Sequence, residues 1–160
     1  MRYERLACHT LSSSLLLPLT LASLVQIESM RTKPSGARFL CWRVIAQIGE
    51  VLEADGELTL TLEEREAEIV SVSDFKDGIA CIGFINKFNA AGAVVAFSGK
   101  VISLGTVEGE RFAVAVLAGR EIMTIKSNGK ELRWEAREGG EGFEIVEISV
   151  GGGDSEIEIA

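Results

Sequence analysis

A chain of 160 residues has room for one domain with a real core, and a hydrophobic content of 47% with only two prolines argues against a disordered chain. The 24 acidic residues outnumber 16 basic ones, and the resulting net charge of -8 repels phosphate backbones, so we expect no direct contact with nucleic acid. Cys8, Cys41 and Cys81 are widely separated and odd in number, which implies no disulfide framework and fits a reducing cytoplasm.

Residues 1–36 are predicted to be an N-terminal extension. The Leu/Ser-rich stretch Leu11–Val25 is similar to the hydrophobic region of a signal peptide, and it is too short and too polar for a transmembrane helix. Two interpretations stay open. A cleaved signal would make the protein secreted or surface-associated, whereas translation from Met30, which we favour, would leave residues 1–29 outside the fold.

From Ala37 onward, short apolar or alternating runs separated by Gly, Asp and Asn predict one antiparallel β domain over residues 37–150. Gly56–Leu62 alternates strictly, as a half-buried strand does and a helix does not. Asn128-Gly129 predicts a type I′ hairpin turn, because both residues accept positive φ. Residues 151–160 are predicted to be a tail that frays or adds an edge strand. The other predicted strands are Phe39–Ile48 (where a helix stays open), Glu68–Val72, Gly78–Ile85, Gly92–Phe97, Lys100–Leu104, Arg111–Leu117, Glu121–Lys126, Leu132–Ala136 and Phe143–Val150.

The number of these strands predicts an all-β fold, either a barrel or a sandwich. Because hairpin follows hairpin and closure removes exposed edges, we expect a single closed antiparallel barrel.

Catalytic signatures are missing from the sequence. The only histidine, His9, lies in the predicted extension, and no nucleophile elbow of the Gly-x-Ser-x-Gly kind is present. The pair Gly92 and Gly99 has six intervening residues where a P-loop has four, and Val101 stands where magnesium binding needs Ser or Thr. We therefore expect no catalytic residue, no metal site and no cofactor.

The stretch Ala93–Ser127 resembles the C-terminal half of the eighth small subunit of archaeal and eukaryotic DNA-directed RNA polymerases. In that family an aromatic-Gly-Lys-Val-like strand leads to a second strand, a glycine corner and a Leu-Met-x-Leu-like strand. Here Gly99-Lys100-Val101, Gly119 and Ile122-Met123 occupy those places. Two departures are that the family's glycine pair is reduced to Ala118-Gly119-Arg120, and that Glu121 replaces a leucine.

The resemblance implies an OB-like barrel of about eight strands that docks on the largest polymerase subunit, as a non-catalytic structural subunit in the cytoplasm. We predict Gly99, Gly119, Arg120 and Met123 as partner-facing positions, because a glycine corner admits a close approach and Met adapts to a partner's surface. For Met123 a place in the core is the competing interpretation. Two other functions stay open: an exported or surface-associated β domain that self-assembles or binds a partner, and a barrel that binds a small molecule.

Overall fold

The computed structural model describes residues 21–25, 36–54, 56–62, 67–87, 92, 94–106, 111–151 and 153–160. These residues form fourteen β-strands and no α-helix, which confirms the all-β prediction, and they include no helix that could span a membrane. The strands are β1 Leu21–Val25, β2 Arg38–Arg43, β3 Ile48–Glu53, β4 Leu58–Leu62, β5 Val70–Asp74, β6 Ile79–Phe84, β7 Val94–Phe97, β8 Val101–Thr106, β9 Arg111–Leu117, β10 Ile125–Ser127, β11 Lys130–Glu131, β12 Trp134–Gly140, β13 Phe143–Ser149 and β14 Gly153–Ile159.

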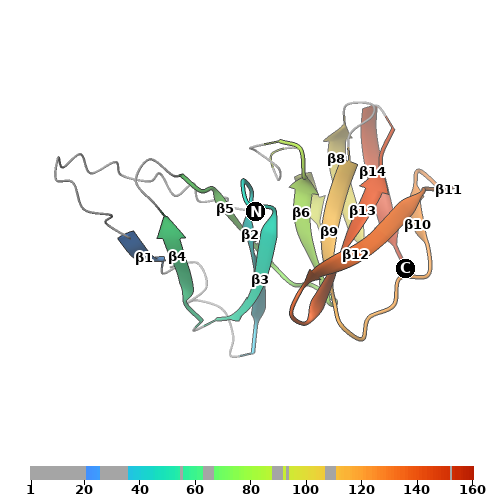
Figure 1. Cartoon of the computed structure of the whole chain (residues 1–160). Helices are drawn as coiled ribbons and strands as arrows, with labels where there is room; N and C mark the ends of the chain where they lie inside the picture. The colour runs from blue at the N-terminus through green and yellow to red at the C-terminus, as the bar shows by residue number, and fades with distance from the viewer. Residues whose placement is uncertain are drawn as a thin grey trace.

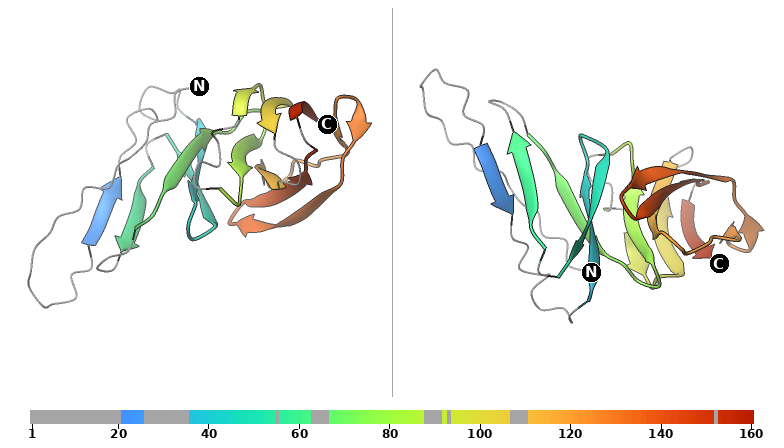
Figure 2. Two further views of the ribbon diagram at one scale, coloured as in Figure 1. Left: turned by 90° about the horizontal axis from the view of Figure 1, so that it is seen from above. Right: turned by 60° about the horizontal axis from the view of Figure 1, so that its bottom comes forward.

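The strands pair into four antiparallel sheets that stand one beside another (Figures 1 and 2). Their orders are β1-β4, β3-β2-β5, β12-β13-β9-β6 and β11-β10-β14-β8-β7. We call the last two sheets, β6 to β14, the C-terminal body. The sheet β3-β2-β5 lies between the C-terminal body and the small sheet β1-β4, which stands at the outer end of the stack (Figure 1).

The two sheets of the C-terminal body are joined along one side only. The run from β11 to β12 pairs with β10 in one sheet and with β13 in the other, and so forms a shared corner. On the opposite side β6 and β7 are terminal strands, and no pairing between them exists in the described residues. The Lys76 ammonium donates to the Phe97 carbonyl oxygen at 3.1 Å, so a side chain satisfies a group at the end of β7. The predicted single OB-like barrel is therefore not confirmed.

Strand β9 is buried on both of its faces. Phe112, Val114 and Val116 belong to the core between the two sheets of the C-terminal body, where the rings of Phe112 and Phe84 meet edge to face. The alternate residues Ala113 and Ala115 belong to a second core, shared with β2. Burial of both faces explains why this strand is a continuous apolar run instead of an alternating one.

Strand β2 is likewise covered on both faces. Leu40 and Trp42 pack with the small residues of β9, whereas Phe39 and Cys41 face a third core with Leu58 and Leu60 of β4. In β4 these leucines are buried and the intervening Thr59 is exposed, so the alternation predicted for this strand is confirmed.

The two predicted end segments take part in the sheets where the structure describes them. Gly153–Ile159 is β14, which pairs with β10 on one side and β8 on the other, so it is an interior strand and not the predicted frayed tail or edge strand. Apolar and charged residues alternate along this strand, and this explains its interior position: Ile157 and Ile159 are buried in the core, while Glu156 and Glu158 are exposed. Within the predicted extension 1–36, Leu21–Val25 pairs with β4 as β1; most of the extension, including His9, lies outside the described residues.

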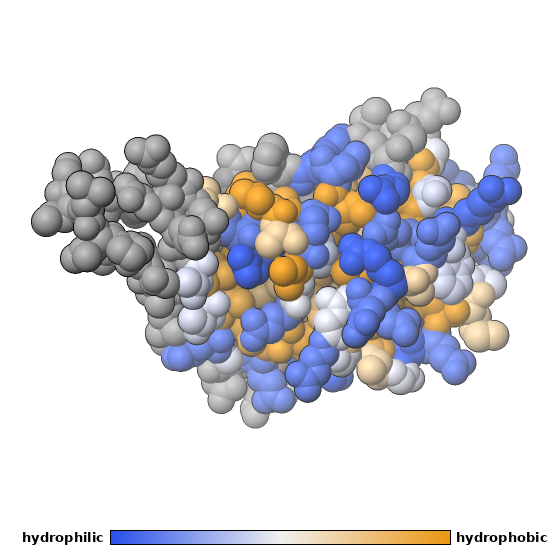
Figure 3. Space-filling model, viewed as in Figure 1, coloured by the Kyte–Doolittle hydropathy of each residue, from blue (hydrophilic) through white to orange (hydrophobic). Residues whose placement is uncertain are grey.

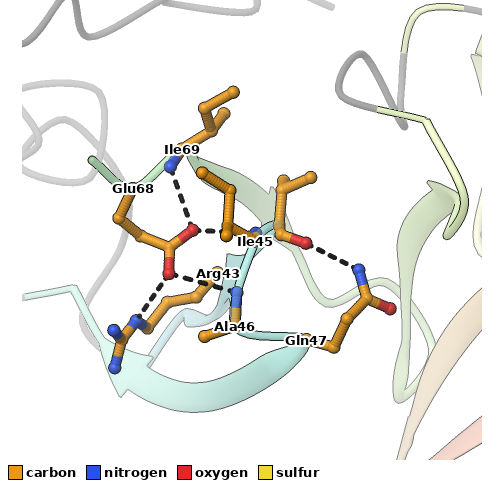
Figure 4. A network of polar contacts seen from close by, with 7 residues as sticks. Arg43, Ile45, Ala46, Gln47, Glu68 and Ile69 are labelled. Carbon is orange, nitrogen blue, oxygen red and sulfur yellow. Dashed lines mark hydrogen bonds and ion pairs between the residues drawn. The ribbon is translucent and has the colours of Figure 1, made fainter. Parts of the chain in front are cut away.

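A buried carboxylate holds the turn between β2 and β3, residues 44–47. The Glu68 side chain is 3% exposed and accepts the Nε–H of Arg43 at 3.3 Å. It also accepts the backbone N–H groups of Ile45, Ala46 and Ile69 at 2.8, 3.2 and 3.0 Å (Figure 4). These four hydrogen bonds compensate the desolvation of the charge and fix the turn against the segment leading into β5.

Gln47 ties the same turn to the C-terminal body. Its side-chain amide donates to the Val44 carbonyl oxygen at 2.6 Å and to the Ile85 carbonyl oxygen at 3.1 Å. Because Ile85 follows β6, this amide bridges the middle sheet and the C-terminal body.

Replacing Glu68 by Ala removes four hydrogen bonds, three of them from backbone donors, and takes the carboxylate partner away from Arg43. We expect the free energy of unfolding, measured by urea denaturation, to fall by about 2 to 4 kcal/mol. Glu144→Ala on β13 is the matched control, since Glu144 is exposed and should change stability by less than about 0.5 kcal/mol. Equal stability of the Glu68→Ala variant and the control would show that Glu68 does not hold the turn.

Because Cys41 and Cys81 are buried, we expect the stability of the fold to depend on pH. Burial raises the pKa of the Cys81 thiol from 9.0 to about 12, and burial together with the Glu50 carboxylate raises that of Cys41 to about 12. The unfolded chain loses these protons above pH 9.0 while the folded chain retains them, so the stability is complete below pH 9.0 and is lost as the pH rises toward 12.

We therefore expect the urea midpoint to fall between pH 9 and 11 more steeply in the natural chain than in a Cys41→Ala, Cys81→Ala variant. A thiol reagent at pH 8 should modify these two cysteines only after unfolding; rapid modification of the folded chain is the opposite result.

Candidate protein-binding site

The four residues predicted to face a partner lie at one end of the C-terminal body. Strands β6 and β8 begin at this end, and strands β9 and β14 end there. The loop after β9 lies at the bottom of Figure 1. Backbone contacts connect the segments, because the Leu117 N–H donates to the Gly78 carbonyl oxygen at 2.9 Å and the Ile159 N–H donates to that of Lys100 at 2.8 Å. We call residues 76–79, 98–101, 117–124 and 160 the turn surface.

Gly99 is buried against another segment of the same chain and is not open to a partner. It is buried with φ of +95°, and a Cβ at this position would lie 3.0 Å from both the Cβ and the carbonyl oxygen of Lys76. Its lack of a side chain lets the turn after β7 touch the turn before β6. Gly99 therefore supports the turn surface from within.

Gly119 and Arg120 lie at the open side of the turn surface. Gly119 is exposed with φ of +89°, and a Cβ there would have no neighbour within 4 Å. The backbone N–H of Arg120 donates to the Leu117 carbonyl oxygen at 3.1 Å and so closes the turn. The Arg120 side chain packs against Gly78, where an added Cβ would lie 3.1 Å from the Arg120 Cδ. The Arg120 Nε is buried and has no hydrogen-bond partner in the described part of the chain. Another chain can approach Gly119 closely, whereas the buried Nε of Arg120 is out of its reach.

Met123 is an exposed apolar side chain on a fixed backbone. It is 74% exposed, so the competing interpretation that placed it in the core is wrong. Its N–H and that of Thr124 both donate to the Ala160 carbonyl oxygen, at 2.7 and 3.1 Å, and the Ala160 N–H donates back to Thr124 at 3.0 Å. The neighbouring Ile122 packs against the core. The loop after β9 thus presents Met123 to solvent from a backbone anchored on β14.

The charges of the turn surface are mixed. Lys100 and Asp77 lie 3.9 Å apart with mostly exposed side chains, a geometry that contributes little to stability. Glu121 is exposed beside Arg120. In the described part of the chain, no group of three or more His, Cys, Asp or Glu side chains could hold a metal ion. The turn surface therefore combines an exposed apolar side chain, charges of both signs and an open backbone at Gly119.

A second feature, which sequence reasoning missed, surrounds the turn between β2 and β3. Ile45, Ile48 and Ile69 are about half exposed, and Figure 3 shows apolar surface over this hairpin. A hollow of about 580 Å³ lies nearby between β3, β4 and the β12-β13 turn, with both arginines and glutamates in its wall. The sequence predicts Phe39–Ile48 as one apolar run because the turn inside it carries no Gly or Pro; only the polar Arg43 and Gln47 interrupt the run.

No family model matches the chain, and no curated protein matches it. The resemblance of Ala93–Ser127 to a polymerase subunit thus stays a prediction.

The contrast between the two glycines gives a matched test. Gly99→Ala adds a Cβ against the Lys76 backbone at positive φ, so we expect unfolding free energy to fall by about 2 to 4 kcal/mol. In Gly119→Ala the added Cβ meets no neighbour, so only the backbone strain at positive φ lowers the unfolding free energy, by about 1 kcal/mol. Urea denaturation of both variants measures the difference, and equal losses would contradict the assignment of Gly99 to an internal contact.

Proposed function

We propose that the chain is a non-catalytic structural subunit that docks on a larger protein through the turn surface. One observation carries the proposal: Gly119, Arg120 and Met123, predicted from the sequence as partner-facing, lie together with Gly99 at one end of the C-terminal body, and Met123 is 74% exposed. A single exposed apolar side chain is common on protein surfaces, and it is the grouping of Met123 with Gly119 and Arg120 on one anchored loop that favours an interface.

Each part of the turn surface has a role in this docking. Met123 supplies a flexible apolar contact whose backbone loses little freedom on binding, because Ala160 already fixes it. The bare Gly119 lets the partner's backbone approach, and the guanidinium of Arg120 can donate to a partner carbonyl or carboxylate. Gly99 keeps the two supporting turns in contact.

The specific assembly that we propose is a DNA-dependent RNA polymerase, with the largest subunit as the partner and the cytoplasm as the compartment. The resemblance of Ala93–Ser127 supports this choice, and so does the net charge of -8, which keeps such a subunit off the nucleic acid. With β11 and β12 taken as one bent strand, β6 to β14 supply eight strands, and we propose that they are a distorted, partly open version of the family's OB-like barrel.

Affinity purification of the tagged chain from its native host tests the proposal. Polymerase large subunits should co-purify with the natural chain, and Met123→Asp should lower their recovery by about tenfold or more, because a buried unpaired charge weakens an interface. Val95→Asp on β7 is the matched control, since Val95 is 75% exposed and lies outside the turn surface. It should leave recovery unchanged.

Two results would count against the proposal. The natural chain could be recovered as a clean monomer, or Val95→Asp could reduce recovery as much as Met123→Asp. Circular dichroism of both variants ensures that a loss of binding is not a loss of fold.

A further inference from the structure

Among the described residues, strand β1 pairs with β4 alone. It pairs antiparallel with β4 over five positions, from Leu21 opposite Leu62 to Val25 opposite Leu58. Neither strand pairs with a further strand in the described residues, so the two form a sheet of their own at the outer end of the stack (Figures 1 and 2). A two-stranded sheet is only marginally stable by itself.

Strand β4 has an anchor that does not depend on β1. Leu58 and Leu60 are buried in a core with Phe39, Cys41 and Leu52 of the middle sheet. When β1 separates from β4, these contacts keep β4 in place with a row of backbone donors and acceptors unpaired. Such an edge accepts another strand.

The composition of both strands favours strand exchange. Neither Leu21–Val25 nor Leu58–Leu62 contains a charged residue or a proline, which are the usual obstacles to pairing at an edge. The residues 26–37 that connect β1 with β2 could span on the order of 40 Å when extended. This length sets how far β1 can move from its own β4 while the chain stays connected.

We propose that β4 accepts β1 of a second copy of this chain, so that two molecules exchange their N-terminal strands reciprocally. The occupant is defined by the structure, since β1 already fits this edge over five residue pairs. Exchange preserves every β1-β4 contact and changes only the path of the connection, so the dimer forms as the concentration rises. This self-association is separate from docking through the turn surface and does not depend on it.

Disulfide trapping in the full-length chain tests the exchange. Ala22 and Thr61 are directly opposed, and opposed positions of an antiparallel pair lie within the Cα separation that a disulfide spans. One variant carries Ala22→Cys and another Thr61→Cys, both with Cys8→Ser, while the buried Cys41 and Cys81 stay. The two variants are mixed, incubated and oxidised, and the disulfide between them is measured on a non-reducing gel.

We expect the mixed disulfide to exceed, by about fivefold or more, the background from Ala22→Cys mixed with Lys130→Cys, and to increase with protein concentration. Lys130 is the control because it is exposed and lies on β11, away from β4. A chain carrying both Ala22→Cys and Thr61→Cys reports whether β1 lies on β4 at all. The proposal is overturned if that chain bonds only within itself while the mixture stays at background, or if neither forms the bond.

Discussion

Strand β9 is buried on both faces, and this double burial holds the neighbouring sheets in place. One face, with Phe112 and Val114, closes the core between the two sheets of the C-terminal body. The other face is built of Ala113 and Ala115, whose small side chains leave room for Trp42 of β2. Because the same strand serves two cores, the middle sheet and the C-terminal body are held together by apolar packing, to which the Gln47 amide adds a polar bridge.

The turn surface follows from the way this central strand ends. β9 leaves the core at Leu117, and its backbone turns on Gly119 before the loop crosses to Ala160 at the end of β14. Two interior strands thus fix the loop at both of its ends, which holds the backbone of Met123 in a defined place. This rigidity is what a docking surface needs, since little conformational freedom is lost when a partner binds.

Local sequence patterns are sufficient to predict some elements of the fold and give no information on others. The alternation of buried and exposed residues from Leu58 to Thr61 and the positive φ of Asn128 and Gly129, 48° and 78°, agree with the predictions because each depends on neighbouring residues only. The interior position of Gly153–Ile159 and the pairing of Leu21–Val25 with β4 depend on partners far along the chain. Such non-local pairings are not encoded in local periodicity, and for the same reason hairpin succession does not reveal that β6 and β7 are unpaired with each other in the described residues. The glycine corner at Gly119 is visible in the sequence, whereas the internal role of Gly99 depends on its contact with Lys76.

The proposed docking requires that a protein partner covers Met123. Hydroxyl-radical footprinting of the chain, free and within the assembly isolated from its native host, measures this directly, with the equally exposed Val95 as the internal reference. If Met123 lies in the interface, its oxidation falls by about tenfold in the assembly while that of Val95 is unchanged. Equal oxidation of Met123 in the free and assembled chain would contradict docking through the turn surface.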